Sequence, residues 1–117
     1  MTDIPLSKSA DKFLCTVYKA YLLKVKKGMS KTEARNFFNF DSLCQELFPK
    51  EKPIDVSASI KELRKIFKMK VYINDTFVLS DDAIIYMENR LGIKRKGIDE
   101  KIKIVTEFIL SHFFKIG

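Results

Sequence analysis

The stretch that decides the fold runs from Asp55 to Leu91, DVSASIKELRKIFKMKVYINDTFVLSDDAIIYMENRL. The spacing of its apolar residues changes twice along this stretch. In its first part the apolar residues are three and four positions apart, as on one face of a helix: Val56, Ile60, Leu63 and Phe67. Asp55 is a residue type that favours the N-cap position. We therefore expect a helix over residues 55–67.

The rest of the stretch predicts two strands and a second helix. Residues 69–73 alternate between apolar and polar positions, which is typical of a half-buried strand. Residues 76–79 can return as a second strand after an Asn-Asp turn. Helical spacing then resumes over residues 81–91, with Ser80 as a suitable N-cap and Gly92 as a suitable end.

The region before Asp55 predicts a long helix and short ones. Apolar residues form one helical stripe from about Ser9 to the glycine at Gly28. Ser30 and Glu33 have the spacing of a capping box, so a short helix is expected from there through about Phe38.

Two further helices are expected. A short one follows residue 40 and is capped by Asp41 or Ser42. The last one runs from about Ile98 to Lys115, after a basic connector at residues 93–97. Its apolar positions alternate four and three apart, like a coiled-coil seam. This seam and the residues beside it include Ile98, Ile102, Val105, Phe108, Ile109 and His112.

The composition is that of a folded, basic domain. The chain has 117 residues, of which 46% are hydrophobic, and its 22 Lys and Arg against 15 Asp and Glu give a formal net charge of +7. These values exclude a disordered, collagen-like or disulfide-rich chain. The sequence has no stretch that would span a membrane and no secretory signal pattern, so we expect a cytoplasmic protein without a membrane partner.

Residues 55–91 resemble the central part of a winged helix-turn-helix domain. Ile60–Lys65 is similar to the second helix of the turn-helix unit, Lys70–Leu79 to the wing hairpin, and Ser80–Glu88 to the helix that often follows a wing. The resemblance covers residues 10–92. It implies a mainly α fold with a small two-stranded β hairpin (α+β), in which residues 1–92 form the winged-helix domain and residues 93–117 a connector and an added C-terminal helix.

The sequence departs from the winged-helix pattern at two places. The segment between the first helix and Asp55 is long and holds two short helical pieces. The glycine that usually follows the recognition helix is also missing, because Phe67, Lys68 and Met69 stand there.

The resemblance implies binding to double-stranded DNA, because a helix can enter the major groove and present side chains to the base edges. The expected DNA-binding residues are Ser57, Ser59, Lys61, Arg64, Lys65, Lys70 and Tyr72. Further phosphate contacts are expected from Lys94, Arg95 and Lys96. The alternatives are a solvated helix face, on which Glu62 dilutes the positive charge, and a solvated linker.

The last helix can either fold back on its own domain or pair with a second copy of the chain. We expect a homodimer through its apolar seam, which would present two recognition helices to palindromic DNA. The expected function is a sequence-specific, dimeric transcription regulator. The alternative is an adaptor or inhibitor module that uses the same fold to bind an acidic protein partner and not DNA.

We expect no enzyme activity, no cofactor and no metal site. The sequence contains no Gly-rich phosphate loop, no metal-ligand cluster and no nucleophile–base pair of familiar spacing. Cys15 and Cys44 lack metal-like spacing, and we expect both to be reduced and buried.

Overall fold

The chain is mainly helical and carries a small antiparallel sheet in the computed structural model, which describes residues 6–37, 39–72 and 76–114. The elements in chain order are α1 (Lys8–Lys26), α2 (Lys31–Ala34), β1 (Asn36–Phe37), α3 (Phe40–Leu47), α4 (Pro53–Phe67), β2 (Lys70–Val71), β3 (Phe77–Val78), α5 (Asp81–Leu91) and α6 (Ile98–Phe113). The predicted α+β class is therefore confirmed. None of the described helices is long and apolar enough to cross a bilayer.

The sheet has one strand more than the sequence predicted. Over the described residues, three short strands pair antiparallel in the order β1-β3-β2, and Phe77 of β3 lies between Phe37 and Val71. The helix expected through Phe38 ends at Ala34, because the chain then extends to pair with β3. The predicted Asn-Asp turn of the hairpin lies outside the described residues.

Two of the helix starts follow the predicted signals, and the starts of α3 and α4 differ from them. Ser30 and Ser80 cap their helices through their hydroxyls, as expected. Asn39 caps α3 in place of Asp41 or Ser42, and its side-chain oxygen accepts the backbone N–H groups of both. The helix α4 begins at Pro53, two residues before the expected Asp55, because proline fits the first turn of a helix, where no intrahelical donor is needed.

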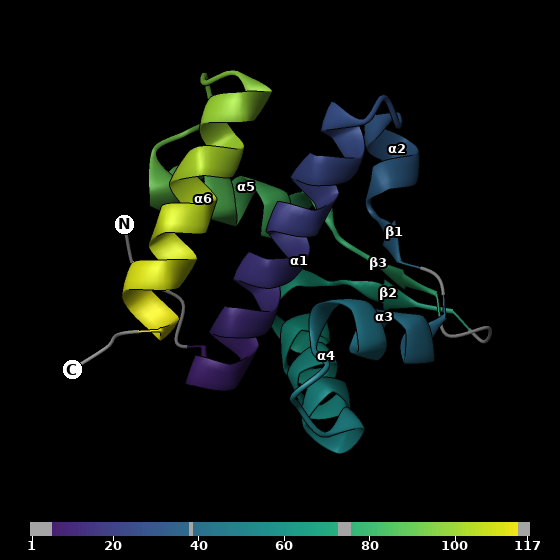
Figure 1. Ribbon diagram of the computed structural model, residues 1–117. Helices are drawn as coiled ribbons and strands as arrows, with labels where there is room; N and C mark the ends of the chain where they lie inside the picture. The colour runs from purple at the N-terminus through teal and green to yellow at the C-terminus, as the bar shows by residue number, and fades with distance from the viewer. Residues whose placement is uncertain (1–5, 38, 73–75, 115–117) are drawn as a thin grey trace.

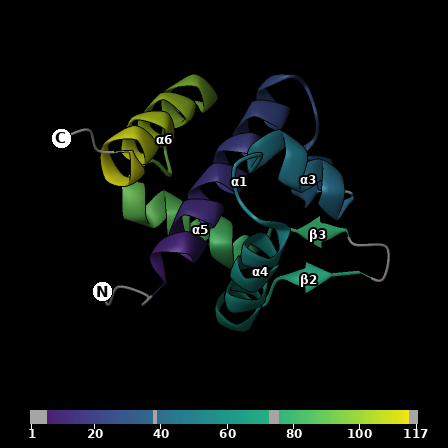
Figure 2. The ribbon, with the colours of Figure 1, turned by 60° about the horizontal axis from the view of Figure 1, so that its bottom comes forward.

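The helix α1 lies at the centre of the fold. Figures 1 and 2 show α6 on one side of α1, with α4 and the sheet on the other. Phe13 of α1 stacks on Phe48, with ring centres 4.9 Å apart, and meets Phe77 of the sheet edge-on at 5.8 Å. The core therefore runs through α1 from the last helix to the strands.

The helix α6 packs on α1 of its own chain. Val105 is fully buried in the common core, and Ile98, Ile102, Phe108 and Ile109 are half-buried against that core. His112 is exposed and stacks on Phe108. The seam expected to form a homodimer is thus used within the chain, and for Val105 the expected role in a dimer interface is wrong. A homodimer through the half-buried and exposed residues of this helix stays a prediction.

An ion pair between Asp11 and Arg90 joins α1 to α5. Asp11 is only 9% exposed, and both of its carboxylate oxygens accept hydrogen bonds from Arg90 Nη1 and Nη2. This hydrogen bonding raises the pKa of Arg90, against the opposing effect of burial. The guanidinium also lies 4.8 Å from the centre of the Phe108 ring of α6. One half-buried cation therefore connects three helices.

We predict that Arg90→Met destabilises the fold by about 3–5 kcal/mol, because the substitution leaves the Asp11 carboxylate buried without its partner. Lys26→Met is the matched control. It removes the exposed ion pair between Lys26 and Asp99, at 2.7 Å, which contributes at most about 1 kcal/mol. Urea unfolding followed by circular dichroism measures both variants. Equal losses in the two would contradict the role assigned to Arg90.

Candidate nucleic-acid interface

The exposed face of α4 carries a group of cations. At 3.6 residues per turn, Ser57, Lys61, Arg64 and Lys65 lie within about 100° of the helix surface. The three cations are exposed, and Ser57 is half-buried. We call Lys61, Arg64 and Lys65 the basic face of α4. Within the described part of the chain, no carboxylate forms an ion pair with any of the three.

The acidic residues of α4 lie on the other side of the helix. Asp55 and Glu62 fall outside the arc occupied by the basic face. The two carboxylate oxygens of Glu62 accept hydrogen bonds from the backbone N–H and the hydroxyl of Ser7, at 2.8 and 2.7 Å. Glu62 is therefore held against the start of α1. The sequence alone had suggested that Glu62 dilutes the positive charge of the basic face. In the fold its carboxylate is turned toward Ser7 and not toward that face.

Two hollows adjoin the basic face. A hollow of about 490 Å³ is lined by Lys61, Arg64, Lys65 and Met69, so the three cations surround one depression. A second hollow, of about 270 Å³, lies between α3, α4 and the hairpin, and we call it the α3–α4 groove. Lys61, Arg64 and Ser57 line it together with apolar side chains from several elements, among them Phe40, Ile60, Val71 and Phe77.

The hairpin continues from the C-terminal end of α4. Figure 2 shows β2 and β3 extending away from the helices beside α4. Lys70 of β2 is exposed, and Tyr72 just beyond it is 51% exposed. Both side chains are therefore accessible on the hairpin, and their contact with DNA stays a prediction.

Other predicted DNA-binding residues do not belong to this surface. Ser59 is only 6% exposed and lies on the core side of α4, so its expected contact with DNA is wrong. The connector with Lys94, Arg95 and Lys96 is exposed but lies at the end of α6 that is far from α4 (Figure 1). Lys96 also pairs with Glu100 at 3.7 Å. The fold therefore separates these three cations from the basic face of α4.

Two features of this surface were missed from the sequence. Phe40 reaches the α3–α4 groove from another helix, and no local pattern signals such a contact. Lys68 adds an exposed cation at the end of α4, where the backbone is left-handed with φ 54°. The helix thus has the ordinary left-handed exit that a glycine usually makes, with a lysine in its place. In the sequence, the absence of a glycine after Phe67 was the signal that another residue makes this exit.

The cysteines and the acidic residues are the remaining candidate groups. Among the described residues, no three His, Cys, Asp or Glu side chains gather as metal ligands would. Cys15 is fully buried, and burial, together with the nearby Asp11 carboxylate, raises the pKa of its thiol to about 12. Cys44 is buried as well. Both cysteines therefore behave as small core residues.

No protein-family model, curated protein or solved structure matches the chain. We therefore infer the function from the geometry of this surface and from the chemistry of its side chains.

We predict that Lys68→Gly stabilises the protein by about 1 kcal/mol, because glycine adopts the left-handed conformation without the steric cost that a side chain brings. Lys65→Gly, inside the same helix, removes the same charge and should destabilise the protein by about 1 kcal/mol. Thermal unfolding of both variants measures the difference. A loss of stability in Lys68→Gly would contradict the assigned backbone conformation.

Proposed function

We propose that the protein is a winged-helix protein that binds double-stranded DNA, with α4 in the major groove and the β2–β3 hairpin on the flanking backbone. The order of the elements supports the proposal. The helix α4, a hairpin and a further helix follow one another after a long first helix, as the winged-helix resemblance implies. The major groove of B-DNA is wide enough to admit one α-helix.

The single observation that carries the proposal is the one-sided charge of α4. Lys61, Arg64 and Lys65 share an exposed face that no described carboxylate neutralises, while Glu62 is hydrogen-bonded to Ser7 on the other side. Such a surface meets the evenly spaced negative charges of DNA without a repulsive group between them. Binding then releases counterions from the DNA, so the affinity falls as the salt concentration rises.

The residues of this surface have different roles in the proposal. Arg64, at the edge of the basic face that borders the α3–α4 groove, can donate two parallel hydrogen bonds to a guanine edge. Lys61, Lys65 and Lys70 can contact phosphates as single charges, which positions the helix but reads no sequence. Recognition by Arg64 would make binding sequence-specific, as a transcription regulator requires.

A second candidate function is binding to an acidic protein partner. It is favoured by the α3–α4 groove, where apolar side chains such as Phe40 and Val71 lie beside Lys61 and Arg64. An acidic amphipathic helix could place apolar side chains there and carboxylates on the cations. Binding to random-sequence duplex DNA at low salt separates the two candidates, because only the first one predicts it.

We predict that the double variant Arg64→Glu/Lys65→Glu binds duplex DNA at least about tenfold more weakly than the wild-type protein at fixed salt. Its plot of log affinity against log salt concentration should be shallower by about one, because Lys65 contacts a phosphate and Arg64 a base edge. Fluorescence anisotropy with a labelled duplex at several salt concentrations gives both values.

The matched control is Lys94→Glu/Arg95→Glu. It changes the net charge by the same amount, but at the connector far from α4 (Figure 1). Its loss of affinity should be clearly smaller, because it weakens only long-range attraction. Equal losses in the two variants, or no binding of the wild-type protein at low salt, would refute the proposed interface.

A further inference from the structure

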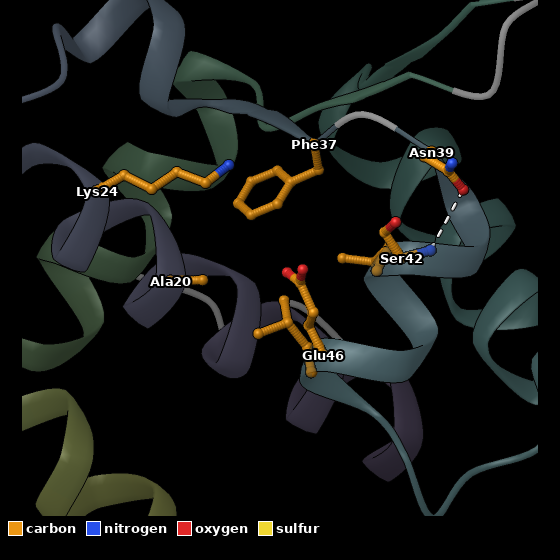
Figure 3. Close-up of a pocket in the computed structure, with 8 residues that line it drawn as sticks. Ala20, Lys24, Phe37, Asn39, Ser42 and Glu46 are labelled. Atoms are coloured by element: carbon orange, nitrogen blue, oxygen red, sulfur yellow. Dashed lines mark hydrogen bonds between the residues drawn. The ribbon is translucent and has the colours of Figure 1, made fainter.

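A cavity of about 370 Å³ lies between α1, β1 and α3, on the side of α3 that faces α1. Figure 3 shows Lys24 reaching into it from α1 and Glu46 from α3, with the Phe37 ring between them. Ala20, Ser42 and Leu47 also line it. The cavity has no part in the proposed DNA interface.

The two charged groups of the cavity face each other without forming an ion pair. The ammonium of Lys24 donates a hydrogen bond to the backbone oxygen of Asn36 at 2.8 Å and lies 3.7 Å from the centre of the Phe37 ring. An ammonium has three donors, so others remain for a ligand. Within the described residues, the carboxylate of Glu46 has no ion-pair partner.

The surroundings of Lys24 favour an incoming anion. Burial lowers the pKa of Lys24, and Glu46 opposes this effect only from a distance. A charge that is partly removed from water and has no close counter-ion is stabilised when one arrives. The exposed carboxylate of Glu46, which lines the same cavity, can accept hydrogen bonds from a cationic group.

We propose that this cavity binds a small zwitterion, an α-amino acid with an aliphatic side chain. Its carboxylate would lie on Lys24, its ammonium on Glu46, and its side chain against Ala20 and Leu47. A ligand with a single charge would pair with one of the two groups and leave the other without a partner. The zwitterion satisfies both, and the lining supplies one charge of each sign.

The probes are L-leucine, L-valine and L-methionine, titrated into the full-length protein by isothermal titration calorimetry. We expect at least one of them to bind. The amide and the N-acetyl derivative of the tightest binder each lack one charge and should bind at least about tenfold more weakly. Absence of binding by all three amino acids, or equal binding of the derivatives, would overturn the proposal.

Two variants test the assigned contacts. Lys24→Met and Glu46→Gln should each weaken binding of the amino acid at least about tenfold. Lys8→Met, on the same helix as Lys24, and Glu107→Gln, on α6, make the same chemical changes outside the cavity and should bind like the wild-type protein. Glu46 is exposed and holds no hydrogen bond of the described fold, so Glu46→Gln should keep the fold, as circular dichroism can verify. Wild-type affinity in Glu46→Gln would overturn the proposal.

Discussion

The ion pair between the buried Asp11 and the half-buried Arg90 is the interaction on which the arrangement of the helices depends. It joins α1 to α5, and the stacking of the same guanidinium on Phe108 brings in α6. A buried carboxylate is stable only with its partner in place, so any other register of α1 against α5 is penalised. Because α1 also forms the core with α4 and the sheet, this pair indirectly fixes which face of α4 is left exposed.

Local sequence signals predicted much of the fold, and pairing between distant segments explains what they missed. The spacing of apolar residues predicted α1 and, together with the Ser80 cap, α5 almost to the residue. The strand β1 could not be predicted, because two residues carry no alternation and become a strand only by pairing with β3. The packing of α6 on α1 could not be predicted either, because an apolar stripe can pack on a helix of the same chain or of another chain.

The candidate site was predicted in part, for a similar reason. The sequence identified Lys61, Arg64 and Lys65, because their spacing alone places them on one face of a helix. It could not show that Ser7, 55 positions away, holds Glu62, nor that the fold carries the Lys94–Lys96 connector to the opposite end. The net charge of +7 is therefore a weaker argument for nucleic-acid binding than the local, one-sided charge of α4.

The central claim is that α4 and the hairpin form the surface that contacts DNA. The most direct measurement is a titration of the ¹⁵N-labelled protein with duplex DNA, followed through its amide resonances. We expect the largest shifts on the amides of residues 57–72, with little change at residues 94–96. Shifts centred on the connector and the end of α1, with α4 unchanged, would contradict it.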